Sequence, residues 1–219
     1  MTPYYQDAFC TIYHGDCREV FAWRNADVLV TDPPYGVAYG SGWDNQFKDV
    51  RIHGDSDTAS RDAVLAAWGT KPALVFGSWK QPRPANVKAV LIWDKGTVGM
   101  GDLALPWFPC TEEIYVLGSG WQGTRTSAVI RCVGQRQGRR HGQTRNEDHP
   151  TEKPLSLMTQ LLGKCPPGTI ADPFMGSGTT LRAAKNFGRR AIGVELEERY
   201  CEVAARRLAQ EVLDFGEAM

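Results

Sequence analysis

Short runs of apolar residues recur along the chain, and each run ends at a glycine, a proline or an acidic residue. Their shortness and their content of β-branched residues predict buried strands rather than helices. The predicted strands span 9–13, 26–30, 73–76, 87–93, 113–117, 169–171 and 191–194. The chain is therefore expected to build a sheet whose strand ends carry polar residues.

Apolar residues at helical spacing lie between several of these strands. In the last such segment Val203, Ala204, Leu208 and Val212 form a stripe, with arginines and glutamates on the opposite side. The predicted helices span 60–68, 155–162, 178–187 and 197–212. Strands that alternate with helices predict an α/β fold with a mostly parallel, doubly wound sheet. Ligands of such sheets bind beyond the carboxyl ends of the strands.

Length and composition fit one globular domain over residues 1–219. The chain is 42% hydrophobic and 23% charged, which is typical of folded proteins. Its apolar runs are shorter than the ~20 residues of a membrane span, and its start lacks a secretory signal, so a cytoplasmic protein without membrane contact is expected. The six cysteines form no Cys-x-x-Cys pair and the four histidines show no ligand spacing, so no metal site is expected.

Charge is distributed unevenly along a chain whose formal net charge is zero. No acid lies between Glu113 and Glu147, and the same stretch is rich in arginine and glycine. Residues 118–148 are therefore predicted to form a short basic insert that binds a polyanion, although a solvated surface loop is an alternative. The candidate nucleic-acid contacts are Arg125, Arg131, Arg136, Arg139, Arg140 and Arg145.

One candidate ligand site follows the predicted strand 169–171. This strand ends at Asp172, and a turn with Gly176 and Gly178 opens the next helix, which would let a ligand approach the backbone closely. The turn lacks the lysine of a nucleotide phosphate loop and the three-glycine spacing of the common dinucleotide fingerprint. The next strand ends at Glu195, which could accept both hydrogens of a ribose diol or could simply cap a helix.

A second candidate site is Asp32-Pro33-Pro34-Tyr35, directly after the strand 26–30. Proline has a fixed φ and no amide hydrogen, and it holds the residue before it extended. The Asp32 carboxylate and the Pro33 carbonyl are thus two acceptors in fixed relation, which suits the two hydrogens of an aromatic amine. Tyr35 offers a ring face for stacking, worth roughly 1–3 kcal/mol per base. Such acceptors would free the amine lone pair to attack a methyl sulfonium in line with it.

Four motifs together resemble those of the amino-methylating DNA methyltransferases, which act on adenine N6 or cytosine N4. They are Gly15-Asp16-Cys17, Asp32-Pro-Pro-Tyr35, His149-Pro-Thr-Glu-Lys-Pro154 and Asp172-Pro-Phe-Met-Gly-Ser-Gly178. The order of the second and fourth is similar to the permuted subgroup called β. The resemblance implies a circularly permuted, Rossmann-like fold, S-adenosylmethionine as cofactor and double-stranded DNA as partner.

The resemblance also implies roles for individual residues. Asp32, Pro33 and Pro34 would hold the amine, and Tyr35 would stack on a base flipped out of the duplex. The implied cofactor-binding residues are Asp16, Cys17, Asp32, Thr151, Lys153, Asp172, Phe174, Gly176, Ser177, Gly178, Thr179 and Glu195. Lys153 is expected near the methionine carboxylate, with a surface salt bridge as the alternative. Residues 36–44 are expected to form a lid over the base.

The target base and the assembly stay open at this point. Aspartate at position 32 favours N6 of adenine, with N4 of cytosine as the alternative, and an RNA substrate or a noncatalytic DNA-binding relative is a lesser possibility. The basic insert is short for the family, which indicates a short target or a homodimer that supplies further contacts. Cys110 follows a proline, as in cytosine C5 methyltransferases, but lacks their partner motif and is interpreted as structural.

Overall fold

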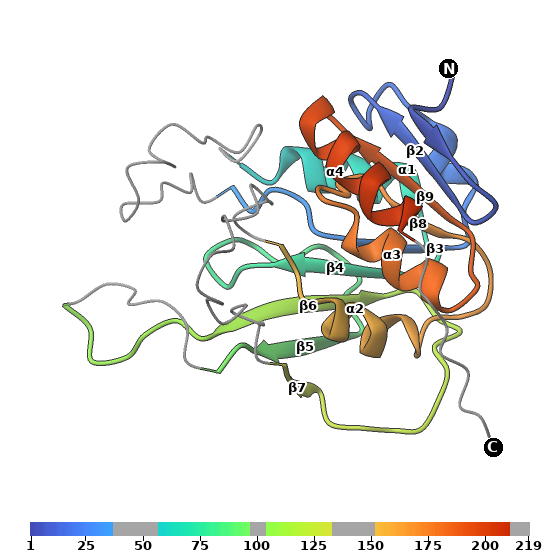
Figure 1. Ribbon diagram of the computed structural model, residues 1–219. Coiled ribbons are helices and arrows are strands. Elements are labelled where there is room, and N and C mark those ends of the chain that lie inside the picture. Colours follow the sequence, from blue (N-terminus) through green and yellow to red (C-terminus); the bar gives the residue numbers. More distant parts are fainter. Residues whose placement is uncertain (37–56, 97–103, 133–151, 211–219) are drawn as a thin grey trace, which may run out of the picture.

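The computed structural model describes residues 1–36, 57–96, 104–132 and 152–210 (Figure 1). These residues build a nine-stranded sheet with the order β1-β2-β9-β8-β3-β4-β6-β5-β7. The strands are β1 (Tyr5–Gln6), β2 (Cys10–His14), β3 (Val28–Thr31), β4 (Ala73–Gly77), β5 (Ala89–Asp94), β6 (Thr111–Leu117), β7 (Val129–Arg131), β8 (Ile170–Asp172) and β9 (Ala191–Glu195).

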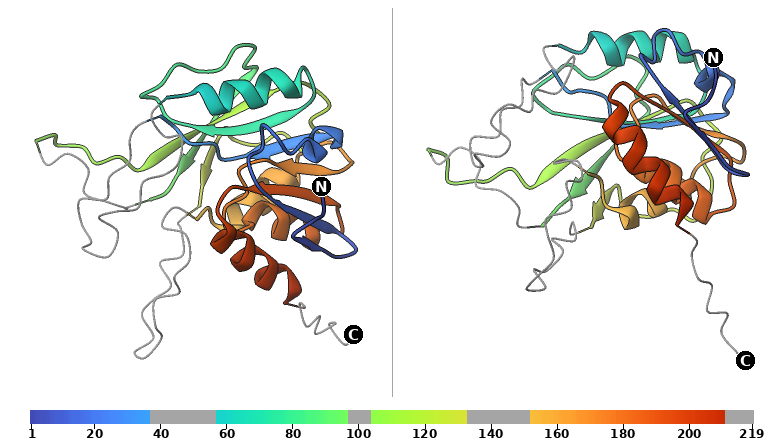
Figure 2. Two further views of the ribbon diagram at one scale, coloured as in Figure 1. Left: turned by 90° about the horizontal axis from the view of Figure 1, so that it is seen from above. Right: turned by 45° about the horizontal axis from the view of Figure 1, so that its top comes forward.

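Helices cover both faces of this sheet, as Figure 2 shows for α1 and α4 on opposite sides. The helices are η1 (Ala22–Asn25, a 3-10 helix), α1 (Ala59–Trp68), α2 (Leu155–Leu162), α3 (Thr179–Asn186) and α4 (Glu198–Ala209). The packing of η1 and α1 buries one face, and α2, α3 and α4 bury the other. The fold is therefore an α/β fold, as the alternation of strands and helices predicts, and it is of the Rossmann-like kind that the resemblance implies.

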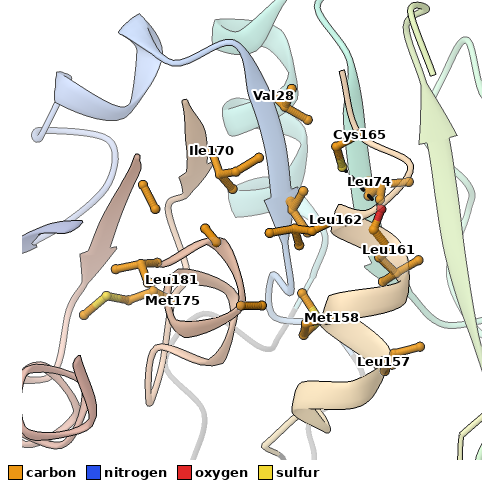
Figure 3. Close-up of a cluster of buried hydrophobic side chains, with 14 of the residues drawn as sticks. Val28, Leu74, Leu157, Met158, Leu161, Leu162, Cys165, Ile170, Met175 and Leu181 are labelled. Atoms are coloured by element: carbon orange, nitrogen blue, oxygen red, sulfur yellow. Dashed lines mark hydrogen bonds between the residues drawn. The ribbon is translucent and has the colours of Figure 1, made fainter. Parts of the chain in front are cut away.

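Alternation along the central strands explains the two faces. Val28 and Val30 of β3 pack in the cluster with α2, α3 and α4, whereas Leu29 packs in the cluster with α1. Successive side chains of a strand point to opposite faces, so a strand that is apolar throughout needs cover on both. Figure 3 shows part of the first cluster, in which Leu161 and Leu162 of α2 pack with the central strands.

The sheet is mostly parallel, as predicted. Strands β2, β9, β8, β3 and β4 run parallel to one another, and β1 pairs with β2 in antiparallel orientation. Beyond β4 the pairs with β6 and β5 are antiparallel, and β7 pairs with β5 in parallel. From β8 the chain returns through α3 to β9 on one side, and from β3 it returns through α1 to β4 on the other. The adjacent carboxyl ends of β3 and β8 therefore form a topological switch point, where ligands of α/β sheets bind.

Three elements differ from the sequence prediction. Strand β1, helix η1 and strand β7, which have two to four residues each, were not predicted from the sequence. Strand β7 lies inside the predicted insert 118–148, and its backbone extends the sheet beyond β5. The described part of that insert is thus bound to the sheet.

Features tied to membranes, metals and disulfides can be assessed for the described residues alone. None of their helices is long and apolar enough to span a bilayer. They contain no group of three or more His, Cys, Asp or Glu side chains placed to hold a metal ion. All six cysteines are free thiols, and Cys110 is the least buried of them.

Candidate active site

Two carboxylates meet at the switch point. Asp172 ends β8 and Asp32 follows β3, and these strands are neighbours with Leu29 opposite Ala171. The hydroxyl of Thr31 donates a hydrogen bond of 2.7 Å to Oδ1 of Asp172, which ties the two strand ends together. Burial raises the pKa of Asp172 to about 6, against hydrogen bonds from Thr180 and Thr31 that lower it.

The glycine turn lies beside Asp172 and is shaped by left-handed backbone at Gly176 (φ 51°) and Gly178 (φ 78°). A Cβ built on Gly178 would lie 2.8 Å from the Cβ of Ala204 in α4. The turn is also held by Glu195, which accepts hydrogen bonds from the amides of Gly176 (3.0 Å) and Glu197 (2.9 Å). Burial raises the pKa of Glu195 despite these bonds. The left-handed backbone of Gly178 and its close approach to Ala204 of α4 together require glycine at this position.

The predicted cofactor-binding residues Asp16 and Cys17 lie at the same end of the sheet. His14 of β2 pairs with Glu195 of β9, and the amide of Gly15 donates to the carbonyl of Glu195 over 2.8 Å. Asp16 follows at once, and its ion pair with Arg18 (2.5 Å) lowers its pKa. Cys17 is buried, and burial raises the pKa of its thiol to about 12.

The Asp32 carboxylate is held on both oxygens. Oδ1 accepts a hydrogen bond of 2.6 Å from the hydroxyl of Tyr35, and Oδ2 accepts one of 2.5 Å from Nζ of Lys153. Lys153 is only 8% exposed, so it does not form a surface salt bridge. Its ammonium also lies 5.5 Å from the ring centre of Tyr35 and 5.1 Å from that of Phe76. The structure therefore brings Lys153 to the Asp-Pro-Pro-Tyr motif.

A carboxylate that sequence reasoning missed joins this arrangement. Glu112 of β6 lies 3.3 Å from Nζ of Lys153 and 3.1 Å from the Tyr35 hydroxyl, and it pairs with Lys95. We call these five residues, Asp32, Tyr35, Lys95, Glu112 and Lys153, the charge cluster. The sequence shows Glu112 only as an acid at the start of one predicted strand and Lys95 only as a lysine at the end of another. Such residues are common at strand boundaries and do not by themselves indicate a site.

The cluster keeps both Glu112 and Lys153 ionised. Burial opposes charge on Glu112, but Lys153 and Lys95 outweigh it and hold the pKa of Glu112 below its ordinary value. Burial likewise opposes charge on Lys153, and the carboxylates of Asp32 and Glu112 raise its pKa above the ordinary value. Burial, followed by the charges of Asp32 and Glu112, raises the pKa of Tyr35 well above 10. Tyr35 is therefore a hydroxyl donor.

A second small network surrounds the start of α3. The guanidinium of Arg207 donates to the hydroxyl of Thr179 (2.8 Å) and to the carbonyl of Ser177 (3.1 Å), and it pairs with Glu152 (2.6 Å). Arg207 belongs to α4, and Glu152 directly precedes Lys153. Arg207 and Glu152 were not identified from the sequence. Together they connect the glycine turn to the segment that delivers Lys153.

Several predicted residues are separate from this site or lie outside the described residues. Arg125 is exposed, and Arg131 is 77% exposed and pairs with Asp94 at 3.1 Å. Phe174, by contrast, belongs to the site: it is partly buried beside Asp172, to which its amide donates over 3.2 Å. The predictions that fall outside the described residues are Thr151, Arg136, Arg139, Arg140, Arg145 and most of the lid 36–44.

Comparison with known proteins adds to this geometry. A family model described as DNA methylase, for N6 and N4 methyltransferases, matches residues 53–206, which is more than half of the chain. The chain belongs to the amino-methylating DNA methylase family. The match extends from before α1 into α4, so it includes the glycine turn and Glu112 of this methylase.

Curated and solved relatives agree with the family. The type II methyltransferase M.ScaI of Streptomyces caespitosus is 23% identical over 95% of this chain and 84% of its own length. A crystal structure of M1.HpyAVI with SAM is 24% identical, with a TM-score of 0.62 over 92% of this chain and 100% of that one. The cytosine-N4-specific PvuII DNA methyltransferase is 14% identical, with a TM-score of 0.69 over 95% of this chain and 89% of that one. The methylase thus shares its fold with these two solved structures, M1.HpyAVI and the PvuII DNA methyltransferase.

Proposed function

We propose that this chain transfers a methyl group from S-adenosylmethionine to the exocyclic N6 of an adenine flipped out of double-stranded DNA. The observation that carries the proposal is the pair of carboxylates at the switch point, with Asp32 in a rigid Asp-Pro-Pro-Tyr turn and Asp172 beside the glycine turn. One site would hold the base and the other the cofactor. Neighbouring strand ends would bring the two reactants together.

The residues around Asp172 fit S-adenosylmethionine, which when bound supplies an electrophilic methyl on a positively charged sulfur. Asp172 is a buried carboxyl that makes no ion pair with any described lysine or arginine, so it suits the cofactor ammonium. Glu195 would accept the ribose hydroxyls and Asp16 would contact the adenine edge. Gly176 and Gly178 would let the backbone approach the cofactor closely.

The residues around Asp32 fit an aromatic amine. The Asp32 carboxylate and the Pro33 carbonyl would each accept one amine hydrogen, while Pro34 keeps the Pro33 backbone extended. A carboxylate oxygen accepts more than one hydrogen bond, so Asp32 can keep its bonds to Tyr35 and Lys153 meanwhile. Because the Tyr35 hydroxyl is fixed at Asp32, the direction of the ring that would stack on the base is fixed too.

N4 of cytosine is the second candidate target. The cytosine-N4-specific PvuII enzyme has the higher TM-score of the two solved relatives described above. Both amines present two hydrogens on an aromatic ring, so the acceptors at Asp32 and Pro33 suit either. We favour adenine because the motif begins with aspartate.

We further propose a circular permutation, since the strand that leads to Asp32 precedes the strand that leads to the glycine turn. The basic insert 118–148 would then recognise the DNA sequence. A homodimer would supply contacts that so short an insert lacks.

Methylation of plasmid DNA with methyl-labelled S-adenosylmethionine, followed by nucleoside analysis of the digest, tests the proposal. Label in N6-methyl-2′-deoxyadenosine supports it, and label in N4-methyl-2′-deoxycytidine transfers the proposal to the second target. Unlabelled DNA, from a protein that binds the cofactor and the DNA, contradicts both. The same assay on RNA excludes or reveals an RNA substrate.

Asp32→Ala is expected to abolish transfer, because it removes one of the two acceptors of the amine. A single preorganised group of this kind is worth about 100- to 1000-fold in rate. Asp62→Ala, an exposed aspartate on α1, is the matched control and should retain the wild-type rate. Circular dichroism and thermal unfolding should show that Asp32→Ala still folds. Wild-type turnover by Asp32→Ala would remove Asp32 from the mechanism.

A further inference from the structure

We infer that Glu112 is a positioning residue for methyl transfer, which balances the positive charges of Lys95 and Lys153 so that Asp32 presents a negative field to the target amine. The inference rests on the proposed function and names a residue outside the four motifs. It follows from the geometry of the charge cluster, from its charge count and from where charge moves during the reaction.

Glu112 lies across Lys153 and the Tyr35 hydroxyl from Asp32. Lys153 lies between the two carboxylates, 2.5 Å from Asp32 and 3.3 Å from Glu112. The Tyr35 hydroxyl also lies between them, 2.6 Å from Asp32 and 3.1 Å from Glu112. That hydroxyl has one proton and donates it to the nearer Asp32, so Glu112 acts on the row through its charge and its ion pair with Lys153. Lys95 closes the row on the other side of Glu112.

The charge count shows why a second carboxylate is needed. Asp32 and Glu112 carry two negative charges, and Lys95 and Lys153 carry two positive charges. Without Glu112 the cluster would have a net charge of about +1 around a half-buried Asp32. Side-chain exposures of 9% for Lys153 and 17% for Glu112 leave little solvent to screen that charge.

The reaction makes this balance matter. The target nitrogen uses its lone pair to bond the methyl carbon, the bond from that carbon to sulfur breaks with its electron pair left on sulfur, and the nitrogen then releases a proton to water. One positive charge therefore moves from the sulfur to the nitrogen, which Asp32 holds. A surplus positive charge behind Asp32 would oppose that movement, and Glu112 removes it.

Single-turnover transfer by Glu112→Gln is the first test. The substitution keeps shape and removes charge, and we expect the rate to fall about 10- to 100-fold while DNA affinity stays within about twofold. Glu112→Gln with Lys95→Met restores the charge balance and should recover most of the lost rate. A double variant as slow as Glu112→Gln, or a Glu112→Gln variant as fast as wild type, would overturn the inference.

Binding of two cofactor analogues gives a readout that does not depend on activity. Sinefungin has a cationic amine where the methyl sulfonium stands, and S-adenosylhomocysteine has a neutral sulfur. Calorimetry should show the preference for sinefungin falling about 5- to 10-fold in Glu112→Gln and returning in the double variant. An unchanged preference would show that Glu112 has no electrostatic role at that position.

Glu113→Gln is the matched control. Glu113 is the next residue of β6, but it pairs with Arg83 at 2.6 Å and accepts a hydrogen bond of 2.8 Å from Tyr115. We expect a lower melting temperature for this variant and an analogue preference like that of wild type. If wild type itself methylates no DNA, the proposed function fails. If wild type methylates DNA and the Glu112 variants behave like it, the inference alone fails.

Discussion

At the scale of single residues, the buried carboxyl of Asp172 lowers the stability of the free protein when it is ionised, and the proposed cofactor site gives a reason for its presence. Burial raises the pKa of this carboxyl from 3.8 to about 6. The folded protein therefore binds the proton more tightly than the unfolded chain between about pH 4 and pH 6, and stability falls as the pH rises through that range. The ionised carboxyl above pH 6 costs the fold about 3 kcal/mol. An ammonium bound beside Asp172 would offset that cost.

Asp172→Asn should therefore stabilise the free protein, with a gain that grows between about pH 4 and pH 6 and is complete above that range. The expected gain is about 2 to 3 kcal/mol at pH 8 and less than about 1 kcal/mol at pH 4, where the folded carboxyl is neutral and the unfolded one is only about half ionised. Denaturant unfolding across this pH range measures it. The same variant should bind S-adenosylmethionine more weakly at pH 8. A gain in stability equal at both pH values would show that Asp172 is not the titrating group.

At the scale of elements, the contact between the glycine turn and α4 decides how closely helix and turn can pack. Gly178 has φ 78°, and a Cβ there would lie 2.8 Å from the Cβ of Ala204. Both partners are thus restricted to small side chains. The conformation of the turn that would bind the cofactor therefore depends on packing against α4, which α3 and β9 separate from Asp172 along the chain.

Gly178→Ala should destabilise the protein by about 2 to 4 kcal/mol. About 1–2 kcal/mol comes from the left-handed backbone and the rest from the clash with Ala204. Ala204→Gly alone should cost about 1 kcal/mol as a glycine within a helix. The double variant should be more stable than the sum of the two losses, because the clash is gone. Strict additivity in this cycle would show that the two residues do not touch.

The sequence could predict elements where the signal is local. Strands β3, β4 and β9 follow continuous apolar runs, and their predicted bounds differ from the observed ones by two residues or less. Strands β1 and β7 escaped because two or three residues become strands only through their partners. Asp32, Asp172 and Glu195 could be placed at strand ends for the same local reason.

The charge cluster could not be predicted, because it depends on pairing that the sequence does not reveal. Glu112 reaches Lys153 and Lys95 only because β5 and β6 are antiparallel, with Trp93 opposite Glu112. In the mostly parallel sheet that the sequence predicts, the start of β6 would lie at the opposite edge of the sheet from the end of β5. The antiparallel pair brings Glu112 to the carboxyl edge, beside Asp32.

At the scale of the whole molecule, a net charge of zero means that attraction to DNA must come from local groups. Among the described residues of the basic insert, Arg125 and Arg131 differ in one respect. Arg131 pairs with Asp94 at 3.1 Å, so a DNA phosphate would have to compete with that carboxylate. Arg125 is exposed and belongs to no ion pair within the described part of the chain.

Salt dependence of DNA binding should separate the two arginines. Each phosphate contact contributes about 0.9 to the slope of log affinity against log salt concentration, so Arg125→Ala should lower that slope by about 1. Arg131→Ala should lower it less, and Asp94→Asn should raise it by freeing Arg131. Arg206→Ala, on α4 and paired with Glu202, is the control and should leave the slope unchanged. Equal slopes for wild type and Arg125→Ala would mean that the described part of the insert does not contact the DNA backbone, and recognition would then have to come from another surface.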